Sequence, residues 1–186
     1  MNLIMMRYRG KVSSSGAVMS SKKSKQFDVQ DWKDAAVQKM KKSREATMDL
    51  FKKLSPAQIE QPRTQGEWTV KDVFAHIVAW EEEAWRRFQL VLQGQADRIP
   101  FYDDMTDTHR FNAQAVELFR NRSMEELLGH AESVREKLIA TLMKLPAKDL
   151  QNNADKYQIV DWFPEFAWDH EEEHRDRIRE WQKNQS

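Results

Sequence analysis

The sequence of 186 residues contains no cysteine, which excludes disulfide bonds, thiolate metal sites and a cysteine nucleophile. Its five glycines and five prolines are too few for the many turns of an all-β sandwich or barrel. The sequence also has no apolar run that approaches the ~20 residues of a membrane-spanning helix. These absences favour a single domain of long helices, and we expect a soluble, cytoplasmic protein with no membrane partner.

Acidic and basic residues number 30 each, so the chain also lacks a net charge. The distribution is uneven, because residues 1–27 hold six Lys or Arg and no acid, which leaves −6 on the remainder. That sign argues against a basic groove for nucleic acid on the folded part. Residues 10–26 are rich in Ser and Lys and have almost nothing to bury. We therefore predict a disordered basic tail at 1–27 and a folded domain at 28–186.

Apolar residues recur along much of the chain at the three- and four-residue spacing of a helix. The segments with this spacing are 28–54, 70–93, 107–121, 124–145 and a last one that starts at Asp161 or Trp162. No segment has the two-residue alternation of a strand. The pattern predicts an all-α fold, a bundle of four main helices with connections of moderate length.

Two helices have clear start signals. Thr69 is a good N-cap, with Asp72 at the position where Glu or Gln completes a standard capping box, and residues 123–126 form a full capping box. Residues 147–160 are polar and are expected to be irregular. Pro164 is tolerable only in a first helical turn, which places the start of the last helix close to it.

The closing segment WDHEEEHRDRIREW, residues 168–181, places two histidines one helical turn apart. On a helical wheel they share the only stripe that can face a core. This stripe comprises Phe163, Ala167, His170, His174, Ile178 and Trp181. Charged residues elsewhere on the helix, Arg175 among them, are expected in solvent. Both imidazoles then point inward, about 6 Å apart at Cβ, a spacing from which two ring nitrogens can converge on one ion. Taken alone, two hydrogen-bonded core histidines explain the pair equally well.

A third histidine in the same place would favour a metal site over two hydrogen-bonded core histidines. His76 lies two turns into the second main helix, at the edge of its apolar stripe. It meets His170 and His174 if the second and last helices are neighbours. His109 opens a helix after a polar loop, and His130 lies off the apolar stripe of its helix, so we expect both to be solvated.

Two blocks of this sequence resemble the DinB/YfiT-like family. GEWTVKDVFAHIVAWEE resembles the W-[ST]-x-x-[DE]-x-x-x-H-[IL] block that opens its second helix, and WDHEEEHRDRI resembles its closing H-x-x-x-H helix. The FN at Phe111-Asn112 and the following NRSMEELL look like the ClbS/DfsB-type branch. The resemblance covers about residues 30–183.

The resemblance implies a four-helix bundle in up-down-down-up order and a divalent metal, usually zinc or nickel, bound by His76, His170 and His174. Activities of such relatives include transfer of low-molecular-weight thiols, maleylpyruvate isomerisation and hydrolysis, and dimers are frequent among them. The ClbS/DfsB-type branch includes a protector that opens the cyclopropane of a genotoxic metabolite and lacks the three histidines. This chain keeps them, so it lies closer to the metal-binding members.

Further side chains are candidates for the same site. Glu173 and Asp169 flank the histidines and could orient an imidazole or move a proton, although exposed carboxylates are the plainer interpretation. An apolar cleft near the ion, or simply core packing, is the expected role of Trp68, Trp80, Phe163, Phe166 and Trp168.

Three functional hypotheses follow from these residues. The first is a metal-dependent hydrolase or thiol transferase that acts on a small electrophilic or toxic compound. The second is a non-catalytic module that binds or sequesters such a compound, and the third is a metal-free structural bundle. The resemblance further implies that a homodimer is possible.

Overall fold

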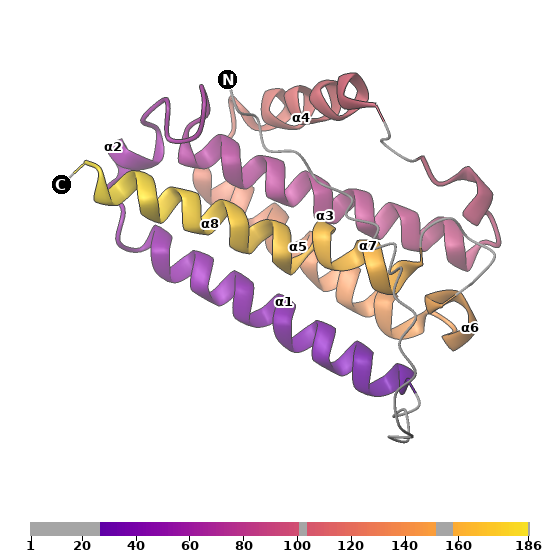
Figure 1. Cartoon of the computed structure of the whole chain (residues 1–186). Coiled ribbons are helices and arrows are strands. Elements are labelled where there is room, and N and C mark those ends of the chain that lie inside the picture. The colour runs from indigo at the N-terminus through magenta and orange to yellow at the C-terminus, as the bar shows by residue number, and fades with distance from the viewer. Residues whose placement is uncertain (1–26, 101–103, 152–157, 186) are drawn as a thin grey trace, which may run out of the picture.

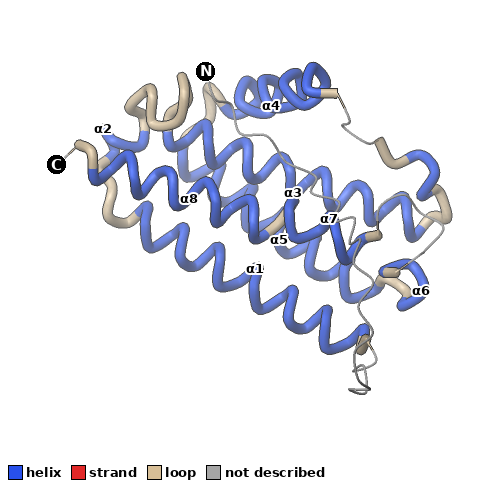
Figure 2. The backbone as a smooth tube through the Cα atoms, viewed as in Figure 1, coloured by secondary structure: helices blue, strands red, loops and turns tan. Residues whose placement is uncertain are grey.

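The computed structural model describes residues 27–100, 104–151 and 158–185. Within these ranges the regular secondary structure is entirely helical (Figure 2), which confirms the predicted fold class. The elements are α1 Val29–Phe51, α2 Pro56–Ile59, α3 Val70–Leu92, the 3₁₀ turn η1 Ala96–Arg98, α4 Met105–Phe119, α5 Met124–Lys144, α6 Ala147–Leu150, α7 Ile159–Phe166 and α8 Trp168–Lys183. Of the predicted tail only Phe27 is described, so its disorder and the domain boundary stay predictions.

Four long helices form the bundle. Figure 1 shows α1 and α8 running in one direction and α3 and α5 in the other, the up-down-down-up order. α1 packs along α8, α3 packs along α5, and α3 also contacts α8. α4 lies outside this bundle against α3 (Figure 1). No helix in the described ranges is long and apolar enough to cross a membrane.

The predicted start signals act as caps. The Thr69 side chain accepts a hydrogen bond from the Asp72 backbone N–H, and the Asp72 carboxylate accepts one from the Thr69 backbone N–H, both at 3.0 Å. Asp therefore completes a capping box here just as Glu126 does after Ser123. Past the end of α3, Gly94 adopts a φ of +70°, the left-handed conformation that suits glycine after a helix.

The closing segment differs from the single helix that its sequence pattern predicts. α7 and α8 are separate helices. The helical backbone is interrupted between them at Ala167, which has φ −115° and ψ −98°. Pro164 lies inside α7 rather than in a first turn, and it has no backbone N–H to donate to the carbonyl one turn before it. The prediction of irregular structure at 147–160 was also wrong at residues 147–150, which form α6, and at residues 159–160, which begin α7.

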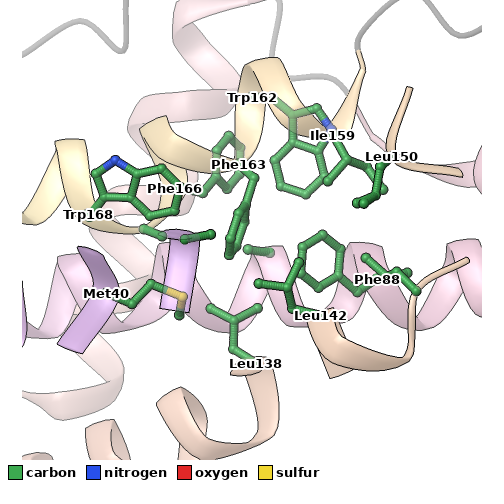
Figure 3. Close-up of a cluster of buried hydrophobic side chains, with 14 of the residues drawn as sticks. Met40, Phe88, Leu138, Leu142, Leu150, Ile159, Trp162, Phe163, Phe166 and Trp168 are labelled. Atoms are coloured by element: carbon green, nitrogen blue, oxygen red, sulfur yellow. The ribbon is translucent and has the colours of Figure 1, made fainter. Parts of the chain in front are cut away.

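The hydrophobic core consists of two clusters. One gathers around α7 and the C-terminal half of α3, and Figure 3 shows its aromatic side chains packed over Met40, Leu138 and Leu142. The second cluster surrounds the N-terminal half of α3, with residues from α1, α5 and α8.

A layer of four charges, three of them buried and Arg44 partly exposed, lies between the two clusters along the helices. It consists of Arg44 on α1, Glu81 on α3, Arg135 on α5 and Glu171 on α8. Both glutamates are fully buried, and Arg44 reaches each of them at 2.9 Å. Arg135 pairs with Glu81 and, at 2.8 Å, with Glu171. Each charge therefore has two partners of opposite sign, which offsets part of the loss of hydration.

Arg175 also differs from its prediction, because it is buried rather than solvated. Its guanidinium donates to the backbone carbonyl of Ser43 at 3.1 Å and to the Ser43 hydroxyl at 3.2 Å. These bonds join α8 to α1.

Candidate metal centre

Three histidines meet where α3 packs against α8. His76 comes from α3, and His170 and His174 come from successive turns of α8. The Nε2 atom of His170 lies 3.0 Å from Nε2 of His76 and 2.9 Å from Nε2 of His174. All three side chains are buried, His174 completely. The sequence stripe thus correctly placed two imidazoles inward, and His76 does meet them.

The ring arrangement fits a shared ion. The three rings are nearly perpendicular in pairs, with interplanar angles of 72° to 80°, and their potential ligand atoms all lie within 4.8 Å of one another. Imidazole nitrogens bind zinc at ~2.0–2.1 Å, so two ligands of one ion can lie about 3 Å apart. The donor set is purely imidazole, which suits zinc and nickel better than calcium or magnesium.

Burial keeps these imidazoles neutral. It lowers the pKa of His76 from 6.5 to about 3. The pKa values of His170 and His174 are also well below 6.5, first because of burial and then because neighbouring imidazoles repel a second positive charge. A neutral imidazole has the free lone pair that a metal requires. The cluster therefore offers nitrogen ligands at neutral pH without prior loss of a proton.

The outer ring nitrogens differ in their partners. Nδ1 of His174 lies 3.0 Å from the Oε1 of Gln65, in the loop before α3. Nδ1 of His170 is buried and has no hydrogen-bond partner within the described part of the chain. Gln65 was not a candidate from the sequence, because a single polar residue in a loop carries no periodic signal.

Two of the predicted pocket aromatics contact the histidines. The ring of Trp68, half-buried, lies 5.0 Å from that of His76, and Trp80 lies 6.3 Å from His76 and 6.4 Å from His170. Phe166 packs edge-on against Trp80 at 5.0 Å, one layer farther away.

The other two aromatics lie in the core. Phe163 packs against Phe88 at 5.0 Å and against Trp168 at 5.5 Å (Figure 3). Lys39 also lies over the Trp168 ring. Their ring contacts are those of the first hydrophobic cluster, and a pocket role for either stays a prediction.

The two candidate carboxylates lie on the exposed side of α8. Glu173 pairs with Arg177 at 2.6 Å. Partial burial raises the pKa of Asp169, and the positive charge of Lys39 opposes that rise. Within the described residues neither carboxylate hydrogen-bonds to the three histidines, so their role in proton transfer stays a prediction.

The remaining histidines lie apart from this cluster. His109 is exposed on α4, as expected. His130 is half-buried rather than fully solvated, with its Nε2 3.2 Å from the Glu82 carboxylate and its ring 5.1 Å from that of Phe119.

Comparison with known proteins adds one finding to this geometry. The sequence pattern of the DinB superfamily matches residues 39–178, a range that includes all three histidines. The chain belongs to the DinB superfamily. No curated protein and no solved structure matches it. Membership of the DinB superfamily agrees with the helical bundle and the buried three-histidine group, whereas the ClbS/DfsB branch stays a resemblance of short motifs.

Proposed function

We propose that this DinB superfamily protein is a metal-dependent enzyme that acts on a small electrophilic or toxic compound, by hydrolysis or by thiol transfer. The observation that carries the proposal is the convergence of three buried Nε2 atoms from α3 and α8. Three protein ligands leave a divalent ion at least one open position, which is typical of a catalytic rather than a structural site.

The ion, zinc or nickel in this proposal, would supply Lewis acidity that lowers the pKa of water or of a thiol substrate. The protein's part is to hold His76, His170 and His174 neutral and close together. Trp68 packs beside the ring of His76, and Trp80 beside those of His76 and His170, so apolar surface lies next to the site and suits an organic substrate.

The bonding of His170 argues against a purely structural bundle. A core histidine without a metal is expected to bond its ring nitrogens to backbone or carboxylate oxygen, because an unpaired buried polar atom is costly. His170 instead directs Nε2 at two other imidazoles, and its Nδ1 has no partner in the described residues.

Metal content tests the proposal directly. We expect about one equivalent of zinc or nickel in the purified protein by elemental analysis, and little or no metal in His170→Ala, because one of three ligands is removed. His109→Ala, which removes an exposed histidine on α4, is the matched control and should retain the metal. Equal metal content in His170→Ala and the wild type would contradict the proposed site.

Activity separates an enzyme from a binding protein. The metal-loaded protein is incubated with an electrophile, with and without bacillithiol, mycothiol or glutathione. Product beyond one equivalent that requires the thiol indicates transfer, and product without thiol indicates hydrolysis. Saturable binding with no product would contradict the enzyme hypothesis and support a protein that binds or sequesters the compound.

A further inference from the structure

We propose that Gln65 is a positioning residue that selects the tautomer of His174. Its amide oxygen accepts the Nδ1 hydrogen of His174 across 3.0 Å and so leaves the Nε2 lone pair directed at the histidine cluster. The proposal rests on the metal centre proposed above, because the tautomer matters most when Nε2 is a ligand.

A closed turn holds Gln65 in place. The backbone N–H of Thr64 donates to the carbonyl of Trp68 at 2.9 Å, and the N–H of Trp68 donates to the carbonyl of Gln65 at 3.1 Å. Gly66 has a φ of +63°, a conformation that favours glycine and allows the chain to reverse here. Because the next residue, Thr69, caps α3, the turn is fixed to the helix that carries His76.

The same turn contacts two histidines of the cluster. Gln65 bonds to His174 from one end, and the Trp68 ring packs on His76 from the other. Gly66 between them is exposed. The turn therefore lies between these two imidazoles and solvent, and it links the position of an α8 histidine to the start of α3.

Tautomer selection follows from the chemistry of the two groups. A neutral imidazole carries its hydrogen on one nitrogen only, and a hydrogen on Nε2 would occupy the lone pair that a metal needs. An oxygen acceptor at Nδ1 stabilises the form with hydrogen on Nδ1. A glutamine can also turn its amide NH₂ toward Nδ1, which would select the opposite form. The two orientations of the Gln65 amide therefore predict opposite tautomers of His174, and these can be distinguished by experiment.

Nitrogen-15 NMR of the metal-free protein reads the tautomer directly. With the His174 signals assigned by comparison with His174→Gln, we expect hydrogen on Nδ1 in the wild type. Gln65→Glu, which keeps an oxygen acceptor, should preserve this form. Gln65→Leu should add the form with hydrogen on Nε2. Glu67→Gln, an exposed change in the same turn, is the matched control.

Zinc affinity, measured by competition with a chelator, gives the second readout. We expect Gln65→Leu to bind zinc 10- to 100-fold more weakly. Gln65→Glu should stay within a few-fold of the wild type, and Glu67→Gln should be unchanged. Circular dichroism verifies that each variant is folded.

Hydrogen on Nε2 of His174 in the wild type would overturn the inference, as would an unchanged tautomer in Gln65→Leu. If no variant and no wild type binds metal, the proposed function fails, while the NMR result still decides the role of Gln65.

Discussion

His76, His170 and His174 occupy positions where a bundle would ordinarily place aliphatic side chains, and burial holds their pKa values far below 6.5. An unfolded chain, in contrast, exposes the same rings to water and protonates them at their ordinary pKa. Each ring therefore couples the folding of the metal-free protein to proton concentration.

The sign of this coupling predicts acid sensitivity. Below pH 6.5 the unfolded state binds protons that the folded state cannot accept, so the free energy of unfolding should fall as the pH falls from 7 to 5. The slope approaches about 1.4 kcal/mol per pH unit for each such histidine. Urea denaturation in the presence of a chelator measures it.

Two variants isolate the histidine contribution. His76→Leu should give a shallower slope, because one of the buried rings is gone. His109→Gln, at an exposed position, should leave the slope as it is. A free energy of unfolding that stays level or rises on acidification, with equal slopes in all three proteins, would show that the rings do not control the effect.

At the scale of a helix, the residue at which each helix starts determines the position of the site residues along it. The capping box of Thr69 and Asp72 starts α3 two turns before His76. The break at Ala167 ends α7 and starts α8, which brings His170 into the first turn of a new helix. A change at a helix start should therefore lower stability without removing a ligand.

Thr69→Ala tests this separation. Loss of the capping hydroxyl leaves the Asp72 backbone N–H without its acceptor, and we expect a loss of about 1 kcal/mol in the free energy of unfolding. Metal stoichiometry by elemental analysis should stay the same. Thr69→Ser retains the hydroxyl and serves as the control. A loss of metal in a folded Thr69→Ala protein would mean that the start of α3 also shapes the centre.

The sequence predicted the helices well where local chemistry determines them. Caps and apolar spacing placed α3 and α5 to within a residue or two, and the closing stripe placed His170 and His174 inward. The break at Ala167 escaped prediction, because the apolar stripe continues through it and spacing cannot report a backbone angle.

Contacts between distant segments were harder to predict. Gln65 reaches His174 across 109 positions of sequence, and nothing near Gln65 signals that partner. Glu81 and Glu171 had a local signal, since each shares a wheel stripe with buried residues three and seven positions farther on. This signal was not enough to predict that they are buried, because a glutamate side chain is usually solvated.

For the whole molecule, the four-charge layer is the feature that all main helices share. Arg135 is its most connected member within the described residues, because it bonds to both buried glutamates and also donates to the backbone carbonyl of Met40 at 2.7 Å. Removing it would leave two buried carboxylates with only the guanidinium of Arg44 between them.

Arg135→Met should therefore destabilise the protein by about 3–5 kcal/mol, the usual effect of breaking a buried ion pair from one side. Arg179→Met, which breaks an exposed pair with Asp176, is the matched control and should change the free energy of unfolding by less than about 1 kcal/mol. Denaturant titration of both variants gives the comparison. Similar small losses in the two variants would show that the layer contributes little.

The position of this layer limits how the helices can slide along one another. A lengthwise slip of one turn, ~5.4 Å, would carry Glu81 or Glu171 away from the arginines and into apolar side chains. α3 carries Glu81 five residues after His76, and α8 carries Glu171 directly after His170. The charges thus fix the lengthwise position of α3 relative to α8. In that position the three imidazole rings stay close to one another.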